Sequence, residues 1–203
     1  METLVLHVSG QGLREAVKIL KGGGVLVYPT ETAYGIGCDA TNRKAVKKVY
    51  CVKKRSPKKP LSVIFGSLEN AKKYVNLDKT GARLVKAFMP GPLTLVARPK
   101  KRLAGSPKNE IAFRIPSGLF ARSLAKEFGR PVTATSANIS GEKPVYAFKD
   151  AFNLFNGKVN AIIDAGSLPR RRVSTVFNLA SMEIARKGAV SESKIKRLLQ
   201  NRA

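Results

Sequence analysis

The chain has 203 residues, enough for one sizeable hydrophobic core, and a formal net charge of +25, with 38 Lys and Arg against 13 Asp and Glu. It has no apolar run near the roughly 20 residues that cross a bilayer and no secretory signal at its N-terminus, so we expect a cytoplasmic protein without membrane contact. One His and two separated Cys offer no zinc ligand set, and the cysteines are expected to be reduced packing residues rather than a disulfide.

Apolar periodicity predicts helices and strands that interleave along the chain. Thr41-Asn42, Ser67 and Ser191 precede helical segments and are typical caps. The glycines 22–24 follow a helix and precede a strand, which indicates a helix-ending turn rather than a phosphate-binding loop. In chain order we expect a strand at 4–8, a helix at 13–20, a strand at 25–28, a helix carrying 45–50, a strand at 61–65, a helix after 67, a helix at 81–88, strands at 93–98 and 111–115, a helix at 119–128, an apolar run at 131–134, a helix at 148–155, strands at 161–164, 175–179 and 182–186, and a helix after 191.

This interleaving predicts a mixed α/β fold. The last strands follow one another closely, which indicates that part of the sheet is antiparallel. No repeat and no shift in composition marks a second domain, so we expect a single domain over residues 1–203.

The positive charge is clustered as well as large. Basic side chains gather at 53–59, 100–102 and 170–172. A field of this size attracts polyanions, so nucleic acid, nucleotides and anionic surfaces are the candidate partners. The alternative is a well-solvated basic surface suited to a salty or hot cytoplasm. Aromatic residues are few and Trp is absent, which disfavours a protein that binds RNA by stacking its bases.

Several polar groups stand at the ends of predicted elements. Lys53-x-Arg55 ends a helix, and a Lys with an Arg suits two anionic oxygens of a triphosphate, although a solvated helix face would look the same. Ser136-x-Asn138 follows the apolar run that ends at Ala134, where it borders a ligand crevice or closes a turn. Arg114 lies in an apolar strand, so its charge needs a ligand carboxylate, an internal Asp or Glu, or solvent.

These segments belong to a longer ordered set of motifs. The set resembles the Sua5/YrdC/TsaC family, the L-threonylcarbamoyladenylate synthases. The resemblance implies a single YrdC-like domain with a core over about 12–200, an open twisted mixed sheet with flanking helices around a basic concavity, and no C-terminal domain of the kind that longer Sua5 members carry. The matching motifs are Tyr28–Gly37, Lys53-x-Arg55, Pro60-Leu61, Pro90–Thr94, Phe113–Pro116, Thr135–Gly141, Ser174–Val176 and Arg186–Gly188.

The resemblance also implies a reaction. L-threonine, bicarbonate and ATP would give L-threonylcarbamoyl-AMP and pyrophosphate, and a tRNA threonylcarbamoyltransferase would use the product to modify adenosine 37 of tRNA. The resemblance further implies that Mg²⁺ is held mainly through ATP phosphates and water, which agrees with the lack of a carboxylate cluster in the sequence. We also expect tRNA as a partner, because of the charge.

Site residues follow from the resemblance position by position. Thr32, Arg114 and Ser174 resemble threonine-binding residues, and the backbone at Ala134 would border the amino acid. The ATP-binding set would be Lys53, Arg55, Ser136, Asn138 and Arg186, with Lys53 and Arg55 as the catalytic pair that neutralises phosphate charge. The chain departs from the family pattern at Lys59, Ile64 and Val145.

Two other functions fit the same fold. The main alternative is an RNA-binding or ribosome-associated protein without synthase activity. A carbamoyl-adenylate site like that of hydrogenase-maturation proteins is disfavoured, because the chain lacks zinc-finger cysteines and an acylphosphatase-like segment. The synthase is preferred because an RNA-binding protein would not need the amino-acid positions Thr32, Arg114 and Ser174.

Overall fold

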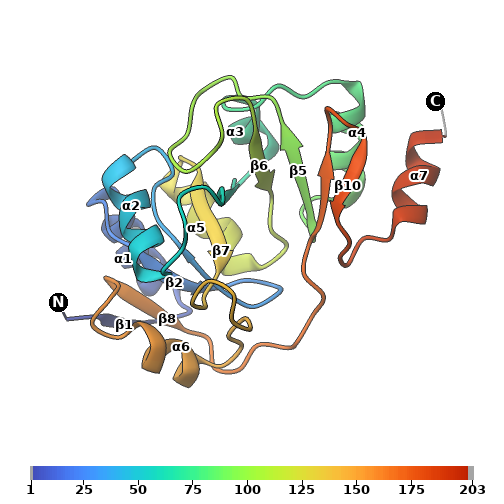
Figure 1. Cartoon of the computed structure of the whole chain (residues 1–203). Coiled ribbons are helices and arrows are strands. Elements are labelled where there is room, and N and C mark those ends of the chain that lie inside the picture. Colours follow the sequence, from blue (N-terminus) through green and yellow to red (C-terminus); the bar gives the residue numbers. More distant parts are fainter. Residues whose placement is uncertain (1, 201–203) are drawn as a thin grey trace.

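The computed structural model describes residues 2–200 and has one mixed sheet with helices on both of its faces (Figure 1). Within that range ten strands pair in the order β1-β8-β2-β3-β7-β4-β6-β5-β9-β10. The mixed α/β class predicted from the sequence is therefore confirmed. The elements are β1 (Leu4–His7), α1 (Gly10–Lys21), β2 (Leu26–Pro29), β3 (Tyr34–Gly37), α2 (Arg43–Val52), β4 (Ser62–Ile64), α3 (Leu68–Lys72), α4 (Lys79–Phe88), β5 (Leu93–Ala97), β6 (Ile111–Arg114), α5 (Leu119–Phe128), β7 (Val132–Ser136), α6 (Phe148–Phe155), β8 (Ala161–Asp164), β9 (Thr175–Asn178), β10 (Glu183–Arg186) and α7 (Glu192–Gln200).

Local sequence signals account for the helix ends. The side chain of Asn42 accepts hydrogen bonds from the backbone of Lys44 and Ala45, and Ser67 caps α3 in the same way, as predicted. Gly22 ends α1, and Gly23 follows with φ of 75°, a conformation that glycine adopts without steric cost. The predicted helix-ending turn is therefore confirmed.

The strand β3 was not predicted. Its four residues include two glycines, and β-propensity alone gives them no strand signal. The strand forms because Tyr34–Gly37 pairs antiparallel with β2 on one side and β7 on the other. An added Cβ on Gly37 would lie 1.9 Å from the carbonyl oxygen of Thr133, so only glycine fits this close approach.

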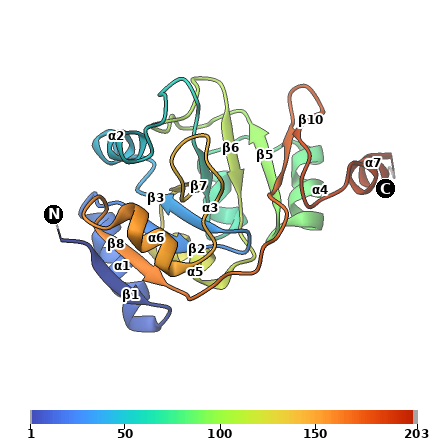
Figure 2. The same ribbon diagram turned by 60° about the horizontal axis from the view of Figure 1, so that its bottom comes forward.

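The helices cover the two faces of the sheet in separate layers (Figure 2). Apolar residues of α1 and α5, such as Leu20 and Leu124, pack together on one face of the strands β2 and β8. Residues of α2 and α6, such as Val49 and Phe155, pack on the other face. A third cluster joins α3, α4 and α7 to the strands β5, β6 and β9. The central strands are therefore buried on both faces, which holds the loops at their ends in fixed positions.

More pairs of strands are antiparallel than the sequence predicted. The expected pair β9 and β10 is antiparallel, but so are β2/β3, β3/β7, β4/β7 and β5/β6. The strand β7 lies between β3 and β4, so it connects the two halves of the sheet. This arrangement brings the turn after β2, the end of β7 and the end of β6 to a common place.

Both cysteines are free thiols; Cys38 is buried as expected, whereas Cys51 lies exposed on α2, so the prediction that it is a packing residue is wrong. Within residues 2–200, no helix has the length and apolar character needed to cross a membrane.

Candidate functional site

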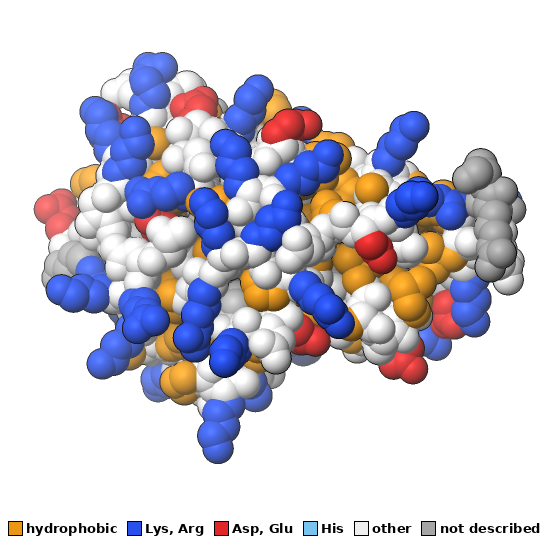
Figure 3. Space-filling model, turned by 90° about the horizontal axis from the view of Figure 1, so that it is seen from above, with side chains coloured by type: hydrophobic (Ala, Val, Ile, Leu, Met, Phe, Trp, Pro, Cys, Tyr) orange, Lys and Arg blue, Asp and Glu red, His pale blue; other side chains and the backbone are white. Residues whose placement is uncertain are grey.

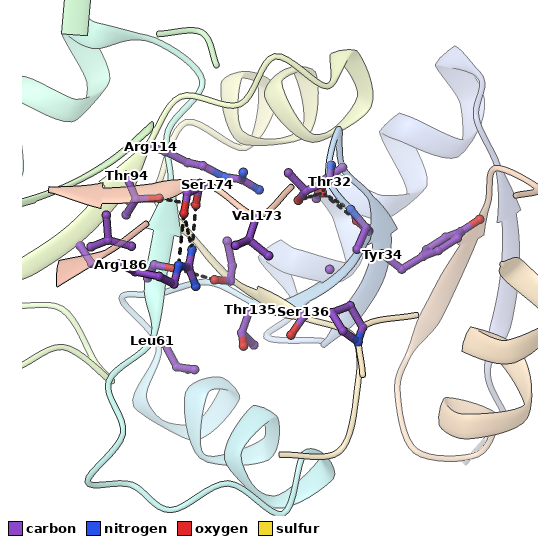
Figure 4. Close-up of a pocket in the computed structure, with 18 of the residues that line it drawn as sticks. Thr32, Tyr34, Leu61, Thr94, Arg114, Thr135, Ser136, Val173, Ser174 and Arg186 are labelled. Carbon is purple, nitrogen blue, oxygen red and sulfur yellow. Dashed lines mark hydrogen bonds between the residues drawn. The ribbon is translucent and has the colours of Figure 1, made fainter. Parts of the chain in front are cut away.

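A cavity of about 360 Å³ opens where the ends of the central strands meet. Figure 4 shows Arg114, Ser174 and Arg186 on one side of it, Thr32 on the other, and Val173 between them. Its wall is formed by segments that lie far apart in the sequence. The lining residues include Tyr28, Thr30, Thr32, Tyr34, Arg55, Leu61, Thr94, Arg114, Ala134, Thr135, Ser136, Tyr146, Val173, Ser174 and Arg186.

The turn between β2 and β3 supplies hydroxyl groups to the cavity. The Thr30 hydroxyl donates to the carbonyl oxygen of Ala33 at 2.6 Å and accepts from the backbone N–H of Thr32 at 3.2 Å. The Thr32 hydroxyl lies 3.1 Å from that of Thr30. The turn is thus fixed by its own side chains, and Thr32 lies at the cavity wall.

Arg114, at the end of β6, forms a buried ion pair with Glu31 of the same turn. Its Nη1 lies 2.9 Å from Glu31 Oε1, and the two side chains are only 11% and 7% exposed. The backbone N–H of Gly118, which precedes α5, donates to Glu31 Oε2 at 3.4 Å. A Cβ on Gly118 would lie 2.9 Å from the backbone nitrogen of Glu31, so glycine permits this approach. Arg has five N–H donors, and within residues 2–200 the Arg114 side chain bonds only to Glu31, so its other donors remain for a ligand.

Ser174, just before β9, connects two further lining residues. Its hydroxyl lies 2.9 Å from that of Thr94, and Arg186 donates to it at 3.0 Å and to its carbonyl oxygen at 2.8 Å. Partial burial and the charge of Arg114 both lower the pKa of Arg186 below its ordinary value. Two guanidinium groups therefore repel each other across this wall, and a bound anion would relieve the repulsion.

The two basic residues that follow α2, Lys53 and Arg55, lie in different surroundings. Arg55 lines the cavity, where its Nε and Nη2 donate to the carbonyl oxygens of Lys59 and Pro60. Lys53 is only 1% exposed and does not line the cavity. Its ammonium donates to the carbonyl oxygens of Ser136 at 2.5 Å and Asn138 at 2.6 Å. Burial, with the nearby charge of Arg55, lowers the pKa of Lys53 to about 8.

Asn138 also faces inward rather than into the cavity. Its Oδ1 accepts from the Ser136 hydroxyl at 2.5 Å and from Lys53 at 3.2 Å. Its Nδ2 donates to the carbonyl oxygens of Ile139 and Glu142. These bonds use the polar groups of its side chain, so in this structure Lys53 and Asn138 fasten the segment after β7 to the end of α2.

The structure thus brings most of the expected site residues together. Thr32, Arg55, Arg114, Ala134, Ser136, Ser174 and Arg186 line the cavity, whereas Lys53 and Asn138 lie behind it. Sequence reasoning missed Glu31 and Thr94, which hold Arg114 and Ser174. Both lie inside quoted motifs, but nothing in their local pattern distinguishes a partner of a site residue from its neighbours.

The chemistry of the wall is that of an anion receptor. It presents Arg55, Arg114 and Arg186, and within residues 2–200 the one carboxylate paired with them is that of Glu31, which is bound to Arg114. Guanidinium groups suit carboxylates and phosphates, and the hydroxyls of Thr32, Ser136 and Ser174 add neutral hydrogen bonds. The site suits a ligand with several anionic groups and a polar, hydroxyl-bearing part.

Comparisons with known proteins find a matching family model and similar solved structures. The family model for Sua5, YciO and YrdC proteins, described as telomere recombination, matches residues 18–188. The structure of P. abyssi Sua5 complexed with L-threonine is similar, with 29% identity and a TM-score of 0.90 over 98% of this chain. MTH1692 from Methanobacterium thermoautotrophicum is 32% identical, with a TM-score of 0.64 over 82% of this chain and 80% of its own. E. coli YciO shares the fold, with 23% identity and a TM-score of 0.84 over 93% of this chain and 97% of its own.

The lengths of these proteins differ. This chain spans 61% of the Sua5 chain that was solved with L-threonine.

Proposed function

The chain belongs to the Sua5/YciO/YrdC family, and on that premise we propose that it makes L-threonylcarbamoyl-AMP and pyrophosphate from L-threonine, bicarbonate and ATP. The proposal rests on the side chains that the cavity wall brings together. It combines a buried guanidinium at Arg114 with two more, Arg55 and Arg186, and with hydroxyls on both sides. One amino acid carboxylate and one triphosphate would account for all three cations.

L-threonine would bind between the β2–β3 turn and β6. Its carboxylate would take the N–H donors of Arg114 that Glu31 leaves, as a charge-assisted pair. The hydroxyls of Thr32 and Ser174 would meet its polar groups, and the backbone at Ala134 would border it. The Ser174 hydroxyl accepts from Arg186, so its own proton is available to Thr94 or to the ligand.

The triphosphate would bind toward Arg55, Arg186 and Ser136. Since Lys53 and Asn138 fasten the segment that carries Ser136, we assign both to positioning that segment rather than to direct phosphate contact. Among residues 2–200, no three His, Cys, Asp or Glu side chains gather as a metal site. We therefore propose that Mg²⁺ enters with ATP, held by phosphate oxygens and water, and neutralises phosphate charge.

The reaction needs positioning and charge stabilisation but no covalent intermediate on the protein. The neutral threonine amine attacks bicarbonate, giving a carbamate and water. A carbamate oxygen then forms a bond to the α-phosphorus, and the bond from that phosphorus to the bridging oxygen breaks, so pyrophosphate leaves with the electron pair. Arg55 and Arg186 would stabilise the charge that develops on the phosphate oxygens, because they are held there before the reaction.

We further propose that the product serves the threonylcarbamoylation of adenosine 37 in tRNA, through a separate transferase, and that tRNA contacts this chain. The net charge of +25 supports such a contact.

The test is pyrophosphate release from ATP that depends on both threonine and bicarbonate, with mass spectrometry of the adenylate. An Arg114→Ala variant should lose the activity, and a Glu127→Gln variant, changed at an exposed site on α5, should keep it. Absence of threonine-dependent release would refute the synthase. RNA binding without release would favour the alternative, an RNA-binding protein on the same fold.

A further inference from the structure

A second cavity, of about 760 Å³, lies on the other side of Arg55, between α2 and the segment 102–106. Arg55 lines both cavities, but the rest of the second wall is separate from the candidate active site. Residues of α2 form one side, and the loop before β6 forms the other. The proposed synthase reaction uses none of these other residues. We call this cavity the α2 groove.

The rim of the α2 groove is strongly basic. Among the described residues, five cationic side chains line it, and no Asp or Glu does. None of the five takes part in an ion pair within residues 2–200. Like charges around one concavity repel each other, and an anion in the groove would remove that cost. The five are Arg43, Lys47, Lys54, Arg55 and Arg102.

Figure 3 shows Lys and Arg side chains spread over much of the face seen from above, with few acidic side chains between them, and more apolar surface toward the C-terminal end.

Lys54 is held in an unusual backbone conformation at the edge of the groove. Its φ is +48°, one of two positive values among the non-glycine residues described. It follows the cap of α2, and its N–H donates to the carbonyl oxygen of Cys51 at 3.0 Å. Glycine usually fills such a position at the end of a helix, because it has no Cβ to strain. A lysine there costs stability, and it places a positive charge at the edge of the groove.

The floor of the α2 groove is apolar. Val46 and Leu103 are buried beneath it, and Tyr50 stands beside them with its hydroxyl donating to the carbonyl oxygen of Lys59 at 3.1 Å. The hydroxyl of Ser106 is enclosed at the wall and has no hydrogen-bond partner within residues 2–200. An apolar floor with a cationic rim suits a base and a sugar joined to phosphate.

We propose that the α2 groove is a second anion-binding site, which takes a nucleotide ligand with its phosphates on the cationic rim and its base over the apolar floor. The ligand is a nucleotide unit of an RNA strand, because the cations are spread along the groove, and binding of a free nucleotide is the other outcome of the test. This site goes beyond the proposed synthase reaction. It is tested by binding alone, so its failure would leave that reaction untouched.

Two double variants on the same helix provide the test. Arg43→Gln/Lys47→Gln removes two charges that line the groove, and Lys44→Gln/Lys48→Gln removes two exposed charges of α2 that do not. The affinity of each protein for a labelled single-stranded RNA is measured by fluorescence anisotropy at several salt concentrations. The groove variant should bind more weakly, and its slope of log affinity against log salt should fall by about 0.7 for each lost phosphate contact.

The control variant should keep the slope of the parent. Both double variants should release pyrophosphate at the parent rate. Equal losses of RNA affinity in the two double variants would overturn the proposal, because they would mean that only the diffuse charge of the surface acts.

A third variant separates binding from folding. Lys54→Gly should leave the melting temperature unchanged or raise it, because glycine relieves the positive φ, and it should still weaken RNA binding. If Lys54→Gly binds RNA as tightly as the parent, the cation at this position has no part in the site. A variant that fails to fold would contradict the strain assigned to Lys54.

Calorimetry with ATP distinguishes the two sources of the ligand. An RNA strand in the groove predicts a single ATP site, and RNA stays bound when ATP saturates the active site. A free nucleotide in the groove predicts a second, weaker ATP site that Arg43→Gln/Lys47→Gln removes. If the protein binds no RNA and also shows no second ATP site that this variant removes, the groove is refuted as a nucleotide site.

Discussion

The pair formed by Arg114 and Glu31 makes a prediction that separates stability from ligand binding. Arg114→Met keeps most of the side-chain volume but leaves the Glu31 carboxylate buried with only the long hydrogen bond from Gly118. Adding Glu31→Gln removes that charge as well. The single variant should therefore be unstable, and the double variant should regain stability, while neither has the guanidinium that threonine requires.

The magnitudes follow from the burial of the pair. Both side chains are nearly enclosed, so breaking the pair from one side should lower the free energy of unfolding by about 3–5 kcal/mol. Neutral groups of similar volume often replace such a pair at little cost, so the double variant should recover most of this loss. Loss of a charge-assisted bond costs roughly 1.5–3 kcal/mol, which is about 10- to 150-fold in threonine affinity for both variants.

The assays are urea unfolding and calorimetry of threonine binding in the presence of ATP. Glu127→Gln, which removes an exposed carboxylate from α5, is the control and should match the parent in both. Threonine binding at parent affinity in the stable double variant would refute the reasoning, because the carboxylate would then lie elsewhere. Parent-like stability of Arg114→Met would show that the pair contributes nothing.

Three further predictions concern other parts of the site and fold. Arg55→Ala should lower kcat/KM for ATP at least about tenfold, on the order of 1.4 kcal/mol, in a pyrophosphate-release assay; unchanged kinetics would remove Arg55 from the phosphate site. Burial and the charge of Arg55 lower the pKa of Lys53 from 10.5 to about 8. Between pH 8 and pH 10.5 the unfolded chain therefore binds more protons than the folded chain. Unfolding curves should show that the parent gains stability relative to Lys53→Met as the pH rises through this window. A flat difference across that pH range would contradict the burial of the charge. Gly37→Ala should cost about 1–3 kcal/mol or more in urea unfolding, because its Cβ would overlap the Thr133 carbonyl, whereas Gly10→Ala, with only an ordinary contact at 3.6 Å, should be tolerated.

The helices could be predicted because their signals are local. The helices α5 and α6 begin and end at the residues expected from apolar spacing, and Asn42 and Ser67 cap α2 and α3 as their side chains indicate. A helix satisfies its backbone hydrogen bonds within one segment, so periodicity and caps within that segment are enough to identify it.

Strand β3 shows where this reasoning fails. Tyr34–Gly37 has two glycines in four residues, and it becomes a strand only because β2 and β7 pair with it. Strand pairing draws on residues about a hundred positions apart, such as Ile36 and Thr135. No local pattern contains that information.

In the candidate site, too, some features could be predicted from local sequence and others depend on contacts between distant segments. The motifs that carry Thr32, Arg114, Ser136 and Ser174 could be recognised in the sequence, and the fold brings all of them to one cavity. Which group each charged side chain faces could not be predicted without the fold. It pairs Arg114 with Glu31 and encloses Lys53 among carbonyl oxygens, because the partner of a buried charge is set by which chain segments meet around it rather than by its neighbours in sequence.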